Sequence, residues 1–198
     1  MMDMRIDAII NSIGKEWVDI DLVNKIRSTP SFNSPEYLDR THFVRLKLSE
    51  IRLDYPEYTS NAPKDIVDIS CGNGICLEIM RYLGHNIQGL DNNHSGFLNF
   101  PRSQGIPLIE FDGNKMPIPL PDKSYDLVIS VGAVHHYRAN WGDVLDEFFR
   151  IARETIFVSM SKGKNFFIRR EELDLHPINK GWVSVEMPEG KYKFIRKI

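Results

Sequence analysis

Short runs of β-branched and apolar residues alternate with stretches of helical periodicity through most of this chain, beginning near residue 65. The runs cover residues 66–69, 86–91, 107–112, 125–131 and 155–160. Between them, apolar side chains recur at spacings of three and four, which indicates amphipathic helices. Strands separated by helices are parallel, so the alternation predicts a doubly wound α/β sheet.

The C-terminal end follows a different pattern. Two more strand-like runs, 182–187 and 191–198, are separated only by the turn Pro188-Glu-Gly190. Strands joined so tightly must be antiparallel. We therefore expect a seven-stranded, mostly parallel sheet with a C-terminal antiparallel hairpin.

The first 60 residues predict helices and no strand. One apolar stripe consists of Ile6, Ile9, Ile10, Ile13 and Trp17. Ser34-Pro35-Glu36 has the residue types that begin a second helix. We interpret residues 1–60 as an N-terminal helical cap segment and residues 61–198 as the ligand-binding core of one compact domain.

Composition excludes several classes of protein. The 198 residues are 42% hydrophobic and 26% charged, with a net charge of −2, which argues against a protein that mainly coats nucleic acid. No segment approaches the run of about 18 apolar residues of a membrane span, and the N-terminus lacks a signal-peptide pattern. Cys71 and Cys76 are too few for a disulfide framework or a cysteine zinc site. We expect a cytoplasmic protein without a metal site or a membrane partner, of undetermined oligomeric state.

The turn after the first strand, Ser70-Cys-Gly-Asn-Gly74, is the natural place for a ligand, because such sheets bind ligands beyond the carboxyl ends of their strands. A dinucleotide-binding fingerprint would need glycines at 70, 72 and 75, and only Gly72 is present. A P-loop is also absent. Gly72 and Gly74 would instead let the backbone approach a ligand that has no phosphate.

Three successive strands end in an aspartate. Asp68 could bind a cationic amine, Asp91 both hydroxyls of a ribose, and Asp112 an adenine amine. A lone aspartate at a strand end is more often a helix cap or a turn former. Three of them, expected in register beside a glycine turn, favour a nucleoside site.

Four motifs resemble those of class I S-adenosylmethionine (SAM)-dependent methyltransferases, in the order and spacing of that family. They are Ile66–Gly74, Gly89-Leu-Asp91, the stretch from Asp112-Gly113 to Ser130, and Val134-His-His136 followed by Leu145–Ile151. The last is similar to the broad group that includes ubiquinone-biosynthesis and tRNA wobble-uridine methyltransferases. The resemblance covers residues 64–160 and implies a Rossmann-like methyltransferase fold with SAM as the cofactor.

The resemblance also implies which residues bind the cofactor: Asp68, Ser70, Gly72, Gly74, Asp91, Asn92, Asp112, Gly113 and Ser130. Ser70 stands where the family usually has glycine, but it is still small. The Pro-Gly-Gly turn that commonly precedes the fifth strand is missing, and residues 153–155 connect directly.

His135 and His136 follow the fourth strand and are the candidate catalytic residues. Either could be a general base or could shape the pocket, and either could instead cap a helix or pack structurally. Because adjacent side chains diverge, we expect one of them, His136, in the methyl-transfer pocket. Ring faces near the sulfonium could come from four residues, each of which could instead be core: Tyr37, Phe43, Tyr137 and Trp141.

The acceptor is less well defined by the sequence. No Asn/Asp-Pro-Pro-Tyr/Phe motif follows the fourth strand, which disfavours nucleobase amines, so we expect a small-molecule or glycan acceptor. A basic C-terminal quarter keeps a tRNA-modifying methyltransferase as the alternative. Its members are Lys162, Lys164, Arg169, Arg170, Lys191, Lys193, Arg196 and Lys197. A non-catalytic partner or scaffold with the same fold is the second alternative.

Overall fold

The computed structural model describes residues 54, 56–59, 62–93, 98–134, 137, 141–159, 181–187 and 191–197. Three predictions lie outside these residues. They are the helices expected before residue 54, the pair His135 and His136, and the basic residues Lys162, Lys164, Arg169 and Arg170. Within the described ranges, no helix is both long and apolar enough to cross a membrane.

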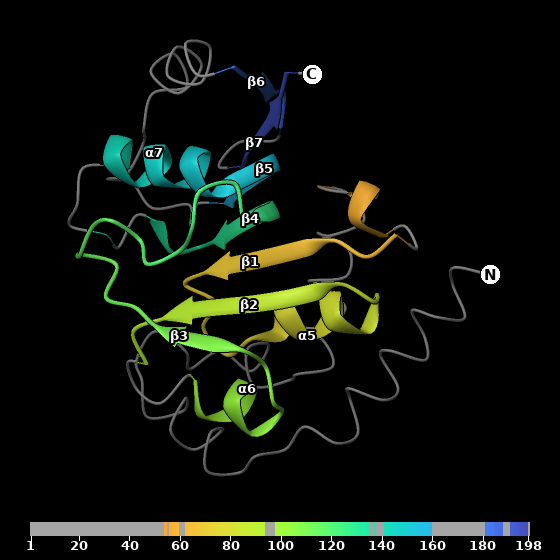
Figure 1. Cartoon of the computed structure of the whole chain (residues 1–198), viewed down its shortest axis with the longest axis vertical. Coiled ribbons are helices and arrows are strands. Elements are labelled where there is room, and N and C mark those ends of the chain that lie inside the picture. Colours follow the sequence, from red (N-terminus) through yellow and green to blue (C-terminus); the bar gives the residue numbers. More distant parts are fainter. Residues whose placement is uncertain are drawn as a thin grey trace.

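Seven strands form one sheet in the order β3-β2-β1-β4-β5-β7-β6 (Figure 1). They are β1 (Asp65–Ile69), β2 (Asn86–Asp91), β3 (Leu108–Glu110), β4 (Tyr125–Val131), β5 (Ala152–Ser159), β6 (Trp182–Val185) and β7 (Lys191–Arg196). The first five are mutually parallel, and β7 lies antiparallel between β5 and β6. The predicted doubly wound sheet with a terminal hairpin is confirmed.

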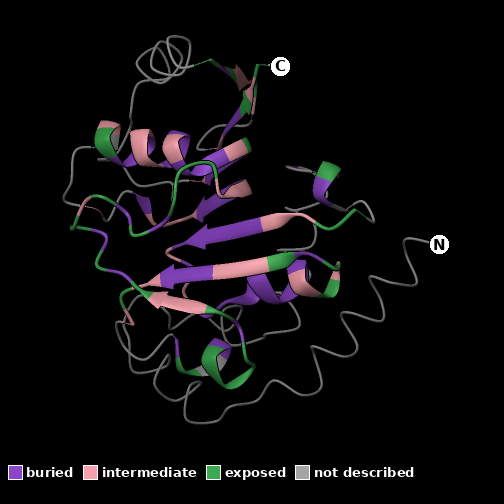
Figure 2. Ribbon diagram, in the orientation of Figure 1, coloured by how far each residue is buried: buried purple, intermediate pink, exposed green. Residues whose placement is uncertain are grey.

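Helices cover both faces of the sheet. The described helical elements are η2 (Pro56–Thr59), α5 (Ile75–Tyr82), α6 (Asn99–Ser103) and α7 (Trp141–Ile151). Apolar side chains of α7 pack in one cluster with Val67 and Ile69 of β1. On the other face, Leu77 of α5 approaches so closely that a Cβ at Gly89 would lie 2.6 Å from its Cδ1. The central strands are therefore buried on both sides, as Figure 2 shows for β1.

Several boundaries differ from the sequence prediction. The fifth strand was predicted at residues 155–160, but α7 ends at Ile151 and β5 begins at the next residue, Ala152, with a bulge in its pairing to β4. Asp112 does not end the third strand, because β3 stops at Glu110. The short helix α6 includes Pro101, which is tolerated because the first turn of a helix needs no N–H at that position.

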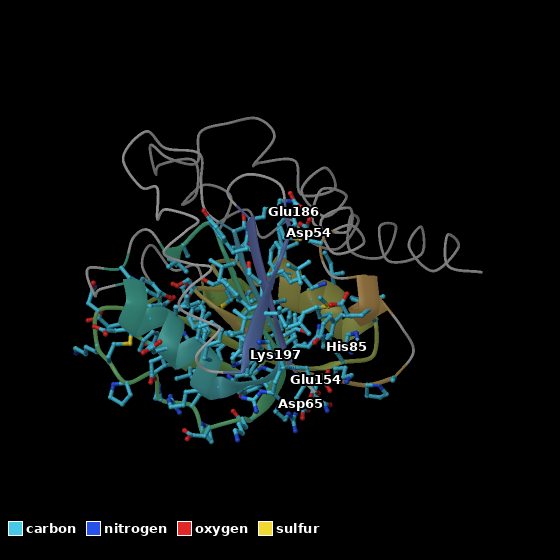
Figure 3. The ribbon with its side chains drawn as sticks, turned by 90° about the horizontal axis from the view of Figure 1, so that it is seen from above. Asp54, Asp65, His85, Glu154, Glu186 and Lys197 are labelled. Atoms are coloured by element: carbon cyan, nitrogen blue, oxygen red, sulfur yellow. The ribbon has the colours of Figure 1, made fainter. Side chains whose placement is uncertain are left out.

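Ion pairs gather at the amino ends of the strands. Arg153 pairs with Asp65 and, at 2.9 Å, with Asp126, while Lys64 Nζ lies 2.7 Å from Glu154. Figure 3 labels Asp65 and Glu154 beside one another at this edge. The amino edge is thus occupied by charge pairs within the protein, and the glycine turns lie at the opposite, carboxyl edge.

Candidate functional site

The turn after β1 lies directly against the end of β2. The N–H groups of Ser70 and Cys71 both donate to the carbonyl oxygen of Leu90, at 2.7 and 3.0 Å. The N–H of Gly72 donates to Oδ2 of Asp91 at 2.8 Å. These bonds bring the glycine turn and the acid of β2 into one site, as the sequence predicted.

Asp91 is oriented by backbone donors on both carboxylate oxygens. The N–H of Gly72 donates to Oδ2, and the N–H of Asn92 donates to Oδ1 at 2.7 Å. These two bonds fix the orientation of the half-buried carboxylate of Asp91 at the carboxyl edge of the sheet.

The two glycines of the turn have different roles. Gly72 and Gly74 both have a positive φ, 54° and 73°, which favours glycine. A Cβ at Gly72 would meet nothing within 4 Å, whereas a Cβ at Gly74 would lie 2.7 Å from Pro101. Gly72 therefore offers open backbone to a ligand, while Gly74 allows α6 to pack. The packing of Pro101 against Gly74 is a role that the sequence analysis did not predict.

The three aspartates are staggered along the edge and are not in register. Asp68 pairs with Gly89, and Asp91 pairs with Glu110, so Asp91 lies two residues further along its strand than Asp68. Two residues of strand span roughly 6.6 Å. Asp112 lies two residues beyond the end of β3. A staggered series of carboxylates fits an extended ligand better than a compact one.

A hollow of about 450 Å³ opens beside this series. Its lining residues are Asn92, Glu110, Phe111, Asp112, Lys115, Pro117 and Pro119. The exposed Asp112 accepts hydrogen bonds from Asn114 N–H and Nδ2, at 3.1 and 2.9 Å, and so also acts as a turn former. The sequence analysis missed Phe111 and the loop prolines as lining residues, although the proline-rich loop after Asp112 was a visible signal.

Tyr137 joins three loops at the carboxyl edge. Its hydroxyl lies 2.5 Å from Oγ of Ser70, on the turn after β1. Its ring lies against Gly113, where a Cβ would come within 2.5 Å of Cε1. Burial raises the pKa of the Tyr137 phenol, and the charges of Asp91 and Asp68 act in the same direction, so the hydroxyl stays protonated.

For the other predicted site residues the structure gives burial but no contact that points to a ligand. Ser130 is fully buried near the end of β4, and its Oγ has no hydrogen-bond partner among the described residues. Asp68 is buried and Asn92 is exposed. Tyr37 and Phe43 lie outside the described residues, as does the side chain of Trp141. In the part of the chain that the structure describes, no group of three or more His, Cys, Asp or Glu could hold a metal ion.

These features fit SAM. The open backbone at Gly72 suits the close approach of a ligand without phosphate. The oriented carboxylate of Asp91 suits ribose hydroxyls, and the hollow at Phe111 is large enough for a planar base. The sheet order, with an antiparallel strand inserted before the last one, defines the Rossmann-like methyltransferase fold.

Comparison with known proteins agrees. Residues 67–157 match the family model described as a methyltransferase domain. Over 101 residues the chain is 32% identical to malonyl-[acyl-carrier protein] O-methyltransferase of Yersinia pestis, a match that spans 50% of this chain and only 37% of that relative. The family model, the curated relative and the methyltransferase structures below together support a class I SAM-dependent methyltransferase with SAM as the cofactor.

Solved structures support the same fold. Magnesium protoporphyrin IX methyltransferase from Synechocystis PCC 6803, with bound SAM, matches with a TM-score of 0.66 and 11% identity, over 98% of this chain and 97% of its own. A 1,6-didemethyltoxoflavin-N1-methyltransferase from Burkholderia thailandensis matches with a TM-score of 0.60 and 12% identity, over 90% and 88%. At these identities the likeness concerns the fold.

Proposed function

We propose that this protein transfers a methyl group from SAM to a small-molecule acceptor in the cytoplasm, with a glycan among the possible acceptors. The observation that carries the proposal is the contact of Gly72 N–H with Asp91 Oδ2, because it joins an open glycine turn to an oriented carboxylate. Bound SAM would supply an electrophilic methyl group, so the protein mainly has to position the donor and the acceptor.

Each part of the carboxyl edge has a proposed role. Asp91 accepts the ribose hydroxyls, and Gly72 presents its backbone to the cofactor. Asp112 and Phe111 border the hollow proposed for the adenine. Asp68, buried at the end of β1, is proposed to act on the cationic amine. His135 and His136 stay the proposed residues on the acceptor side.

A small acceptor is favoured over tRNA because three basic side chains of β7, those of Lys191, Lys193 and Arg196, are engaged within the protein. Lys191 Nζ lies 2.7 Å from Oδ2 of Asp54, and Lys193 Nζ lies 2.7 Å from Oε1 of Glu57. The guanidinium of Arg196 lies 5.0 Å from the ring centroid of Trp182. Cations already paired with carboxylates add little attraction for phosphate. Malonyl-[acyl-carrier protein], named for the curated relative, is one candidate class of acceptor.

The first test is ligand-induced stabilisation. SAM or S-adenosylhomocysteine (SAH) at about 100 times its dissociation constant should stabilise the fold by about 2.7 kcal/mol. ATP and NADH are the matched controls, because the turn lacks the glycines of a pyrophosphate site. A thermal unfolding temperature that responds to neither SAM nor SAH would contradict the proposal.

The second test identifies the acceptor class. Methyl-labelled SAM is incubated with a lysate and the protein, and the labelled product is sorted by size, with Asp91→Ala as the control. Label in the small-molecule fraction supports the proposal. Label in tRNA, with binding that weakens steeply as salt rises, would favour the tRNA alternative. Tight SAH binding without any labelled product would favour the non-catalytic partner.

A further inference from the structure

Ser70 has an unusual backbone conformation for a residue with a side chain. Its φ is 67°, in the left-handed region that favours glycine. A residue other than glycine is strained in this conformation, so a contact of its side chain is needed to stabilise it. The hydroxyl of Tyr137, 67 positions away in the chain, supplies one at 2.5 Å from Oγ of Ser70.

Tyr137 is itself fixed by a second close approach. Its ring lies on Gly113, where a Cβ would fall 2.5, 2.8 and 3.0 Å from three ring carbons. Any residue larger than glycine at 113 would push the ring away from Ser70. Tyr137 therefore connects the turn after β1, the loop after β3 and the loop after β4.

We propose that Tyr137 is a positioning residue for the cofactor site, acting through the Ser70 hydroxyl and not by direct contact with the cofactor. The Ser70–Tyr137 hydrogen bond keeps the turn in the left-handed conformation, and this conformation directs Gly72 N–H to Asp91 Oδ2 at 2.8 Å. A glycine at position 70 would adopt this conformation without strain, whereas Ser70 needs the hydrogen bond to the Tyr137 hydroxyl to stabilise it. The inference rests on the proposed function, because the turn is taken to be the SAM site.

The experiment is a double-mutant cycle with SAH as the probe and calorimetric affinity as the readout. Tyr137→Phe should weaken SAH binding about tenfold in the wild-type background, because the competent turn is populated less. In a Ser70→Gly background, Tyr137→Phe should change the affinity by less than about twofold, because glycine adopts a φ of 67° without strain. Ser70→Ala removes the same hydrogen bond from the other side and should match Tyr137→Phe.

The matched control is Tyr125→Phe, which removes a partly buried hydroxyl at the amino end of β4 and should leave SAH affinity unchanged. Thermal unfolding of every variant is measured in parallel, since a merely structural role would lower stability without changing affinity. Equal losses in both backgrounds would mean that the hydroxyl touches the cofactor and would overturn the inference. Tighter binding by Tyr137→Phe would overturn it too, because the tyrosine would then compete with the ligand. Absence of SAH binding by the wild type would instead refute the proposed function, and this inference with it.

Discussion

The backbone N–H of Gly72 donates to Oδ2 of Asp91 across 2.8 Å, although the two residues are 19 positions apart. This bond makes the loop after β1 and the end of β2 one unit. The ribose that we propose to bind at Asp91 would therefore meet a carboxylate whose orientation is already set, and less conformational freedom would be lost on binding.

Replacement of Asp91 should remove cofactor affinity and leave the fold intact. Hydrogen bonds to a charged group contribute about 1.5–3 kcal/mol each, so Asp91→Ala should weaken SAH binding more than tenfold. Calorimetry gives the affinity, and circular dichroism checks the fold. The control is Glu154→Gln at the amino edge, which should bind SAH like the wild type. Wild-type affinity in Asp91→Ala would show that the ribose assignment is wrong.

Removal of the Ser130 hydroxyl should not destabilise the protein. Ser130 is fully buried, and its Oγ makes no hydrogen bond to a described residue, so the folded state carries a desolvated polar group. Ser130→Ala should unfold in urea with a free energy equal to the wild type or up to about 1 kcal/mol higher. Ser124→Ala is the comparison, because Ser124 Oγ donates to Pro121 O at 2.7 Å and its loss should lower stability. A clear destabilisation by Ser130→Ala would reveal a partner outside the described residues.

His85 should be important for stability because both of its ring nitrogens bond to backbone. Nδ1 accepts from Lys64 N–H at 3.2 Å, so Nε2 carries the proton and donates to Tyr58 O at 2.6 Å. Figure 3 labels this residue, which is 5% exposed. His85→Ala would leave a buried N–H and a buried carbonyl unpaired and should cost about 2–4 kcal/mol in urea denaturation. Tyr58→Phe removes a hydroxyl that donates to Asp126 O but keeps both ring nitrogens of His85 bonded to backbone, so it should cost less. Equal stability of His85→Ala and the wild type would contradict this interpretation.

Glu147 should contribute to the loss of unfolding free energy at acidic pH. The hydrogen bond from Arg150 lowers the pKa of the Glu147 carboxyl, helped by the N–H of Ile118, which donates at 2.7 Å. Because the folded pKa is the lower one, this stabilisation is complete above the ordinary glutamate pKa of about 4.3 and is lost as pH falls through the folded value. Glu147→Gln should therefore be less stable than the wild type by about 1 kcal/mol at pH 7.

The same variant supplies its own control across pH. The difference in unfolding free energy between wild type and Glu147→Gln should shrink as the pH is lowered from 6 toward about 3. A difference that stays constant over this range would mean that packing, and not the charge of Glu147, accounts for the loss.

The sequence by itself determined the architecture and the place of the site. Short β-branched and apolar runs separated by helical periodicity predict a parallel sheet, and the short turn at residues 188–190 predicts the antiparallel hairpin, both of which the structure has. The turn after Asp68 and the acid at Asp91 were recognisable because ligands bind at the carboxyl ends of parallel strands. Each of these patterns consists of residues that lie close together in the sequence.

Only the tertiary structure decided which of these residues meet. Pro101 occupies the side of Gly74 that the sequence assigned to a ligand. The sequence analysis included Lys191 in a basic C-terminal quarter, but its ammonium group pairs with Asp54, 137 positions away in the chain. Ser70 tolerates its conformation beside the hydroxyl of Tyr137. Such pairings join distant parts of the chain and depend on how helices and strands pack. Periodicity and spacing describe only neighbours along the chain, so they carry no information about these contacts.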